Sequence, residues 1–344
     1  MAATIKDVAK RAGVSVITVS RVINGAEYVR AETQARVQAA IDDLHYVPNQ
    51  LASSLRSRQN DTLALVVPDI ATTFWTAMAR GAEDEAWASG YSLFLCNTDD
   101  EPLKEERYIE NLLRRRVAGL AVVATIDSTI LLQRLDMHHL PFVMLHRKIA
   151  GIEADVVRSD SRAGAFALTT RLLERGWQRI AYVGGPLASS LGQDRLAGYR
   201  DALIGAGITP DPALIKLGVH KQQSGYDLVT ELVQMRPLPE AICIGNSRLA
   251  LGALHALTEA GMRVPQDLTI AAFFEISSLI DDSRLVATPL IVATQPAYQI
   301  GRLGIRRLLE RIAGQHGAAE DILLSVDVAD RAGYSVPLVS SVGA

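Results

Sequence analysis

The chain has little cysteine, no long hydrophobic run and no recognisable export signal. Its 344 residues include only Cys96 and Cys243, which make no metal-binding spacing and at most one disulfide. No apolar run approaches the roughly 18 residues that a membrane span needs. The first residues lack a basic segment followed by an apolar one. We therefore expect a soluble, cytoplasmic protein with reduced thiols and no membrane partner.

Common catalytic motifs are also missing. Neither G-x-G-x-x-G nor a Gly-Lys-Ser/Thr ending is present, so Gly184-Gly185-Pro186 is not a phosphate-binding loop. The G-x-S-x-G elbow and the H-E-x-x-H zinc motif do not occur either. We expect no catalytic residues, no metal and no cofactor, and an enzyme is kept only as a remote alternative.

The composition is that of a globular protein with more than one domain. Hydrophobic residues make up 49% and charged residues 21% of a chain that is long for a single domain. Residues 1–60 carry eight Lys/Arg against five acids, a net charge of +3, whereas the whole chain carries −3. The remaining residues therefore carry −6. A basic segment on an acidic body suggests that this segment meets a polyanion.

The first 46 residues predict three short helices. Thr4 precedes an amphipathic stretch that stops at Gly13, a residue that often ends a helix. A second helix should begin after Ser15 and end near Asn24-Gly25, and a third should span about 31–44. Two helices joined by a tight glycine turn form the helix-turn-helix pattern.

Residues 47–60 predict a linker that can become ordered. Pro48 ends the preceding helix, and Asn49 can cap one short turn that reaches about Leu55. So short a helix is marginal by itself because helix nucleation is costly. The segment should become helical only when something packs against it.

From Asp61 onward, predicted strands and helices alternate. The run Leu63–Val67 is continuously apolar, which is typical of a strand buried on both faces. Further strands are expected at 92–96, 120–124, 142–145, 179–183, 214–217, 241–244, 268–274 and 322–328, with helices between most of them. This pattern predicts an α/β body of helix-covered parallel sheets, and its length favours two doubly wound subdomains.

Several stretches match one family, in order, along nearly the whole chain. They are TIKDVAKRAGVSVITVSRVING at 4–25, the hinge at 46–55, Val67-Pro68-Asp69, Gly81-Ala82-Glu83, Arg195–Tyr199, Gly245-Asn246, Ala250–Ala253, Pro289 and Thr294-Gln295-Pro296. In these stretches the chain resembles the lactose-repressor (LacI/GalR) family of bacterial transcriptional regulators. The resemblance implies an all-α helix-turn-helix head with a hinge helix, followed by two doubly wound parallel-sheet subdomains like those of periplasmic binding proteins.

The resemblance also implies a domain organisation. The DNA-binding head would span 1–46, the hinge 47–60, and the effector-binding and dimerisation core 61–344. Within that core, the N-subdomain would comprise about 61–160 and 291–322. The C-subdomain would comprise about 161–290 and 323–340.

The start of the second helix is expected to enter the major groove of DNA. Val16 and Ile17 stand there as two apolar residues directly after a cap, where they can contact thymine methyls. The alternative is that both pack in the head's own core. Arg21 can reach a guanine or only a phosphate. The set implied for DNA contact, some of which could instead cap or pack, is Thr4, Ser15, Val16, Ile17, Thr18, Ser20, Arg21, Asn24, Tyr46, Asn49, Leu51, Ala52 and Leu55.

Leu55 is an apolar residue in a Ser/Arg-rich linker. Proteins that bend DNA use such a leucine as a minor-groove wedge. By resemblance, two hinge helices meet in the minor groove of a palindromic operator, which implies a homodimer. The alternative is that Leu55 packs on the body. The last residues show no leucine heptads, so we expect a dimer and not a tetramer.

Two similar lobes should enclose a cleft at the carboxyl ends of their strands. Aromatic faces can stack on a sugar ring, while Arg, Asn and Gln bond its hydroxyls. Trp75 and Phe274 could instead be core aromatics, and His220 a solvated loop residue. The effector-binding set implied by the resemblance is Phe74, Trp75, His146, Arg147, Asp160, Arg195, His220, Asn246, Phe274 and Gln295.

The chain departs from the family pattern inside this cleft. Phe274 replaces a carboxylate that commonly bonds sugar hydroxyls, while Ser247 and His146 stand where Asp is common. A pocket that loses acceptor charge and keeps Arg147 and Arg195 would be cationic and would suit an anionic ligand. The expected effector is a sugar, a sugar acid or a phosphosugar.

The predicted function is a sequence-specific transcriptional regulator, a repressor of carbohydrate or sugar-acid catabolism genes released by an inducer. Control by a co-repressor and a DNA-linked sugar-processing enzyme are the alternatives. A free solute receptor would need an export signal and no head, and the chain shows the reverse.

Overall fold

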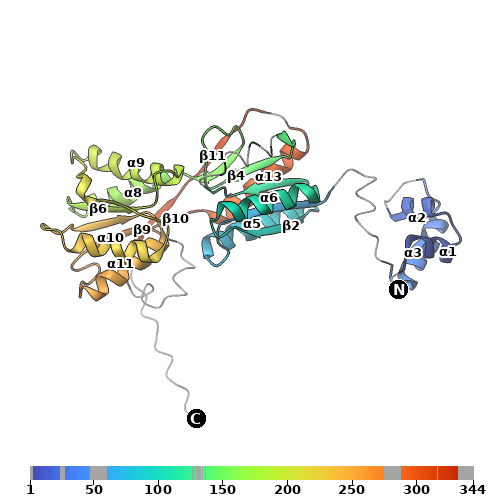
Figure 1. Ribbon diagram of the computed structural model, residues 1–344, viewed down its shortest axis with the longest axis horizontal. Coiled ribbons are helices and arrows are strands. Elements are labelled where there is room, and N and C mark those ends of the chain that lie inside the picture. Colours follow the sequence, from blue (N-terminus) through green and yellow to red (C-terminus); the bar gives the residue numbers. More distant parts are fainter. Residues whose placement is uncertain are drawn as a thin grey trace, which may run out of the picture. The chain divides into compact units, whose positions relative to one another are not determined.

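The computed structural model describes residues 3–23, 28–46, 60–125, 128, 133, 135, 137–274, 288–315 and 317–331. The chain divides into two compact units, Met1–Asn60 and Asp61–Ala344. The helices of the first unit are called the head below, and the second unit is called the body (Figure 1).

The head consists of α1 (Ile5–Ala12), α2 (Val16–Ile23) and α3 (Ala31–Asp43). The backbone N–H of Thr4 donates to the Asp7 carboxylate at 2.9 Å, and this contact closes a capping box before α1. Gly13 ends α1 with a φ of 66°, a left-handed conformation that glycine adopts without strain. The three helices bury a small core of Val8, Ala9, Ala12, Val19, Val22, Val37 and Ala40. The predicted helix-turn-helix is confirmed.

The first lobe of the body is built on a fully parallel six-stranded sheet in the order β11-β5-β4-β3-β1-β2. Its described strands and helices have the following bounds. The strands are β1 (Thr62–Val67), β2 (Ser92–Asn97), β3 (Gly119–Val122), β4 (Phe142–Leu145), β5 (Val156–Ser159) and β11 (Asp321–Leu324), and the helices are α5 (Thr73–Ala88), α6 (Pro102–Arg115) and α13 (Ala297–Ile312). Alternate residues of β1 face opposite sides, with Leu63 packing under α5 and α13 and Ala64 on the side of α6.

The second lobe repeats this plan in the order β12-β10-β9-β8-β6-β7, with β12 antiparallel to β10. Helices α8 and α9 cover one face, and α10 and α11 cover the other. The elements are α8 (Ser161–Glu174), β6 (Ile180–Gly184), α9 (Ser190–Gly205), the 3₁₀ turn η1 (Pro212–Leu214), β7 (Ile215–Leu217), α10 (Gln222–Val233), β8 (Ala241–Ile244), α11 (Ser247–Glu259), β9 (Thr269–Phe273), β10 (Leu290–Thr294) and β12 (Asp327–Arg331). Two doubly wound lobes are therefore present, as the alternating pattern predicts.

Within the described residues three connections join the lobes, and the strand pairing at them differs from the expected boundaries. The chain passes to the second lobe after β5 and returns after β10, because β10 bonds to β9 and β12. The N-subdomain is expected from the sequence to resume at 291, but residues 290–294 belong to the second sheet. The single strand expected at 322–328 is two strands, β11 in the first sheet and β12 in the second. The break follows from the different partners of the two halves, since β11 pairs with β5 and β12 with β10.

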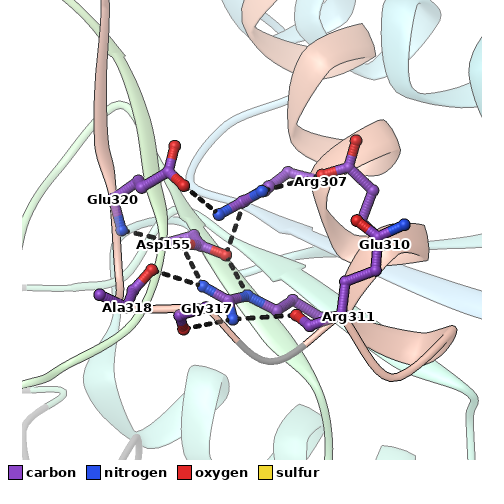
Figure 2. A network of polar contacts seen from close by, with 8 residues as sticks. Asp155, Arg307, Glu310, Arg311, Gly317, Ala318 and Glu320 are labelled. Atoms are coloured by element: carbon purple, nitrogen blue, oxygen red, sulfur yellow. Dashed lines mark hydrogen bonds and ion pairs between the residues drawn. The ribbon is translucent and has the colours of Figure 1, made fainter.

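A network of ion pairs anchors the carboxyl end of α13 in the first lobe (Figure 2). The Asp155 side chain, fully buried, accepts hydrogen bonds from Arg307 Nε at 3.0 Å and Arg311 Nε at 2.6 Å. The backbone N–H of Glu320 donates to the same carboxylate at 2.9 Å. Arg311 also donates to the carbonyl of Gly317. The network therefore fixes the segment that leads into β11, just before the third connection.

Every helix in the part of the chain that the structure describes is too short or too polar to traverse a lipid bilayer. Among the same residues, no three His, Cys, Asp or Glu side chains are grouped closely enough to hold a metal ion.

Candidate functional site

The beginning of α2 presents apolar side chains on the surface of the head. Val16 is 36% and Ile17 59% exposed, and neither belongs to the head's core. The alternative that both pack inside the head is therefore wrong. Arg21 is exposed one turn further along the same helix. The three side chains remain predicted DNA contacts, and their exposure on the head is compatible with that role.

The polar residues around α2 have structural partners. Ser15 Oγ accepts a hydrogen bond from the Thr18 backbone N–H at 3.1 Å and so caps the helix. Tyr46 packs on the core of the head, and Ser20 is half-buried. These roles are compatible with phosphate contacts and do not test them. Five predicted contacts lie outside the described residues, namely Asn24, Asn49, Leu51, Ala52 and Leu55.

The body contains a cavity of about 530 Å³ to which both lobes contribute. Its wall includes residues one or two positions after the ends of β1, β2, β4, β8 and β10. These are the carboxyl ends of parallel strands, where ligands bind in such sheets. The structure brings together eight of the ten predicted effector residues, namely Phe74, Trp75, His146, Arg147, Arg195, His220, Asn246 and Gln295.

Two predicted effector residues lie elsewhere. Phe274 is buried in the core of the second lobe beneath α10 and α11, so the alternative of a core aromatic is correct for it. Phe273 lines the cavity instead, because successive strand residues face opposite sides of a sheet. Asp160 caps α8 by accepting a hydrogen bond from the Ala163 N–H at 2.9 Å and is not part of the cavity wall.

One wall of the cavity is an aromatic cluster. The ring centroid of Phe74 lies 4.6 Å from that of Trp75 and 4.7 Å from that of the His146 imidazole. His146 has a φ of 62°, and the N–H of Arg147 donates to the carbonyl of Leu145 at 2.6 Å, which forms a γ-turn centred on His146. Such a turn is rare and strained, and strained backbone is concentrated at functional sites. Burial, with Arg195 and Arg147 nearby, holds the pKa of His146 well below its usual value, so the ring is neutral.

The charges around the cavity are balanced. Arg147 donates to the Asp100 carboxylate at 2.6 and 3.3 Å, and Arg248 of α11 pairs with Asp69 of the first lobe. Among the described residues of its wall, four are acids, namely Asp69, Asp99, Asp100 and Glu101, and four are bases, namely Arg147, Arg195, Lys221 and Arg248. Asp99 also pairs with Lys104, which is not part of that wall. This count does not support the expected surplus of positive charge, which stays a prediction. The missing carboxylate at 274 is compensated by acids in the loops after β1 and β2.

Arg195 is a buried charged residue of the second lobe. Its side chain is buried, donates to the carbonyl of Gly245 and to Gln295 Oε1 at 2.9 Å, and lies 3.8 Å above the ring of Phe273. Gln295 Oε1 also accepts from Ser159 Oγ of the first lobe at 2.8 Å. Both Ser159 and Gln295 lie at connections between the lobes. An effector atom that binds Arg195 would therefore also affect the contacts at these connections.

His220 is linked to the amino end of α11. Asn246 caps that helix, with its Oδ1 accepting from the Leu249 N–H at 2.8 Å, and its Nδ2 contacts His220 Nδ1. Burial, followed by Arg147 and Arg195, lowers the pKa of His220 to about 4. His220 is therefore a neutral residue of the cavity wall, and the alternative of a solvated loop residue is wrong.

The family models and the relatives agree with this architecture. Residues 4–49 match the model of bacterial regulatory proteins of the lacI family, and residues 60–331 match that of periplasmic binding proteins and the sugar-binding domain of the LacI family. The HTH-type transcriptional repressor PurR of Haemophilus influenzae (strain PittEE) is 35% identical over 90% of this chain and 91% of its own. The ribose operon repressor of Escherichia coli (strain K12) is 34% identical over 90% of this chain and 93% of its own.

Solved structures show the same likeness. The lac repressor dimer bound to operator and the anti-inducer ONPF superimposes with a TM-score of 0.84 at 27% identity. That match covers 97% of this chain and 99% of the lac repressor chain. The likeness therefore extends over head and body together.

Proposed function

Because the chain belongs to the LacI family and is a DNA-binding transcriptional repressor with a sugar-binding domain, not an enzyme, we propose that it binds a palindromic operator as a homodimer under the control of a small effector in the cleft. The observation that carries the proposal is the cavity in which an aromatic wall of the first lobe faces Arg195, His220 and Asn246 of the second. Such a repressor acts on chromosomal DNA, which sets its place of action in the cytoplasm.

The head would read the operator through the beginning of α2. The exposure of Val16 and Ile17 supports direct contact with base edges, since a surface helix without a partner seldom presents two apolar residues there. We retain the predicted division into a head at 1–46, a hinge at 47–60 and a core at 61–344. Leu55 stays a predicted minor-groove wedge.

A homodimer would join two such heads to the two halves of a palindrome. One edge of the first sheet supports this, since β2 is an edge strand on which Phe94 and Leu95 are each 43% exposed. Apolar side chains on an exposed sheet edge are typical of an interface. Sedimentation equilibrium of the native chain and of a Phe94→Asp variant would measure this association.

The effector would be a sugar or a close derivative held between the lobes. An aromatic wall suits the apolar face of a sugar ring, and Arg195, Asn246 and Gln295 suit its hydroxyls. The balanced charges of the cavity favour a neutral sugar over a sugar acid or a phosphosugar, because each ionised group introduced there needs a counter-charge. D-ribose is the first compound to test, in view of the ribose operon repressor among the relatives.

Effector control would act through the closure of the two lobes. A ligand that contacts both lobes favours the arrangement in which it makes more contacts. The contacts between Ser159, Gln295 and Arg195 lie at the joint and would transmit that preference to the segments that precede the body. Release by an inducer is the simpler scheme, and recruitment by a co-repressor is the alternative.

A thermal-shift screen over neutral sugars, sugar acids and phosphosugars tests the proposed effector class. A ligand at 100 times its dissociation constant stabilises the folded state by about 2.7 kcal/mol. We expect neutral sugars to raise the melting temperature of the native chain and not that of an Arg195→Ala variant. Stabilisation of both proteins to the same extent would place the ligand outside the cleft.

A further inference from the structure

We propose that Asn246 fixes His220 in the tautomer that carries its proton on Nε2, which makes His220 a hydrogen-bond donor into the cleft that requires an acceptor atom on the effector. Asn246 is then a positioning residue and His220 a specificity-determining one. The part that concerns the effector rests on the function proposed above. The part that concerns the tautomer is a property of the free protein.

The orientation of the Asn246 amide follows from its position at the start of α11. Its oxygen accepts the Leu249 backbone N–H at 2.8 Å, which satisfies one of the open donors at the beginning of a helix. The reverse orientation would place the amide NH₂ against that backbone N–H, with two donors facing each other. The capping bond therefore directs the NH₂ group of Asn246 toward the neighbouring imidazole.

The proton on His220 is then determined by elimination. Its Nδ1 faces the Asn246 NH₂ group, so Nδ1 acts as the acceptor. Burial and the nearby Arg147 and Arg195 lower the pKa of His220 to about 4, with Asp100 acting weakly in the opposite direction. A second proton is therefore absent at neutral pH, and the single proton of the ring belongs on Nε2.

His220 belongs to the cavity wall, and its Nε2 atom is an unsatisfied buried polar atom there. It is buried and has no hydrogen-bond partner among the residues that the structure describes. A Cβ atom added to Gly185 would lie 2.1 Å from His220 Cε1 and 2.6 Å from Nε2, so the ring rests directly on the Gly185 backbone. Buried donors are nearly always bonded, so the partner of this one is expected on the molecule that fills the cavity.

The surroundings of His220 select the kind of atom that it meets. Arg147 Nε is also buried without a partner among the described residues, and guanidinium groups are donors only. The cavity wall thus holds one buried donor without a described partner from each lobe. The effector should present an oxygen acceptor there, such as a hydroxyl, ring or carbonyl oxygen, and a protonated amine at that position should be rejected.

Long-range ¹H–¹⁵N correlation of the histidine rings in the free, full-length protein measures the tautomer directly. The chain has seven histidines, so a His220→Gln variant assigns the resonances of that ring. We expect His220 to be neutral at pH 7 with its proton on Nε2. A proton on Nδ1, or a charged ring at pH 7, would overturn the inference.

The substitution Asn246→Asp provides the sharper comparison. The new carboxylate would still cap α11, because aspartate caps as well as asparagine. It would, however, turn an acceptor oxygen toward Nδ1, so the proton should move to Nδ1 and the pKa of His220 should rise. Asp160→Asn is the matched control, since it makes the reciprocal change in the same kind of cap on α8, outside the cavity wall. It should leave the His220 signals unchanged.

The outcomes separate this inference from the proposed function. If the tautomer is unchanged in the Asn246→Asp variant, Asn246 does not set it and the inference fails, whatever the protein binds. Should the variant not fold, the measurement on the native chain still decides. If no sugar stabilises the native protein, the proposed effector class fails while the tautomer assignment stands.

Discussion

The surface of the head that we propose to contact DNA and the cleft of the body are built in opposite ways. Val16, Ile17 and Arg21 share one helix of eight residues and project outward from it. The cleft draws on residues from Pro68 to Gln295, and its side chains bond to one another across loops and lobes. The effects of substitutions on the head should therefore be additive, whereas a substitution in the cleft should also change the contacts of neighbouring residues.

The largest effect expected from this comparison is the separation of the two activities by truncation. A protein comprising 61–344 should lose specific operator binding entirely, because the basic segment and α2 are removed. It should keep the thermal shift produced by a sugar. Electrophoretic mobility shift and calorimetry on both proteins measure this, and operator binding by the truncated chain would refute the role of the head.

Stability should depend on Asp155 and not on exposed ion pairs. Asp155→Ala leaves Arg307 and Arg311 without their buried carboxylate and should reduce the free energy of unfolding of the body by about 3–5 kcal/mol. Asp201→Ala breaks an exposed pair with Arg162 and is the matched control, with an expected loss below about 1 kcal/mol. Equal losses in urea denaturation would contradict this distinction.

The contribution of Asp155 should also depend on pH. Burial alone would raise its pKa, but the hydrogen bonds from Arg311, the Glu320 N–H and Arg307 outweigh it and lower the pKa. The pKa of an unfolded aspartate is about 3.9, so the contribution is complete above that pH and is lost as the pH falls through the lower folded pKa. The stability difference between native protein and Asp155→Asn should shrink below about pH 4, and a constant difference would contradict the assignment.

Operator preference should respond to Val16 and Ile17. Replacing either by alanine should change the order in which operator variants bind, since a base contact discriminates by about 1–3 kcal/mol. Arg21→Ala is the comparison and should reduce affinity for all operators. Fluorescence anisotropy over a set of operators measures the order, and uniform weakening by the alanine variants would assign both residues to packing.

The smallest effect is expected at the pair that links the lobes across the cleft. Asp69→Asn removes the partner of Arg248, and because both side chains are partly exposed the change in sugar affinity should be at most about 1 kcal/mol. A charge-swapped variant, Asp69→Arg with Arg248→Asp, should restore part of the loss. Arg80→Gln, which breaks an exposed pair within α5, should change nothing. Calorimetry would contradict the account if the swapped variant bound more weakly than either single variant.

The head could be predicted nearly completely from the sequence because its signals are local. The cap at Thr4, the stop at Gly13 and the apolar spacing lie within a few residues of the helices that they define. The alternation of strands and helices in the body is equally visible. Strands β5 and β10 are not predicted, although Val156 and Leu290–Ala293 are apolar, because so short a run becomes a strand only through its neighbours in the sheet.

The cleft could be predicted only in part because its composition depends on topology. The sequence favours Phe274 over Phe273, an error of one residue that exchanges the two faces of a strand. The acids Asp69 and Asp100 are missed because they belong to separate loops, and only the parallel arrangement of β1 and β2 places both at one edge. The ion pairs that they form with Arg248 and Arg147 therefore could not be predicted from the spacing of these residues in the sequence.

We expect operator binding and effector binding to be carried by separate parts of the chain. Anisotropy of labelled operator DNA with the Arg195→Ala variant, with and without a sugar identified by the thermal-shift screen, tests it most directly. We predict that this variant binds the operator as the native protein does and no longer responds to the sugar. A variant that responds normally, or that loses operator binding while its thermal unfolding is unchanged, would contradict the account.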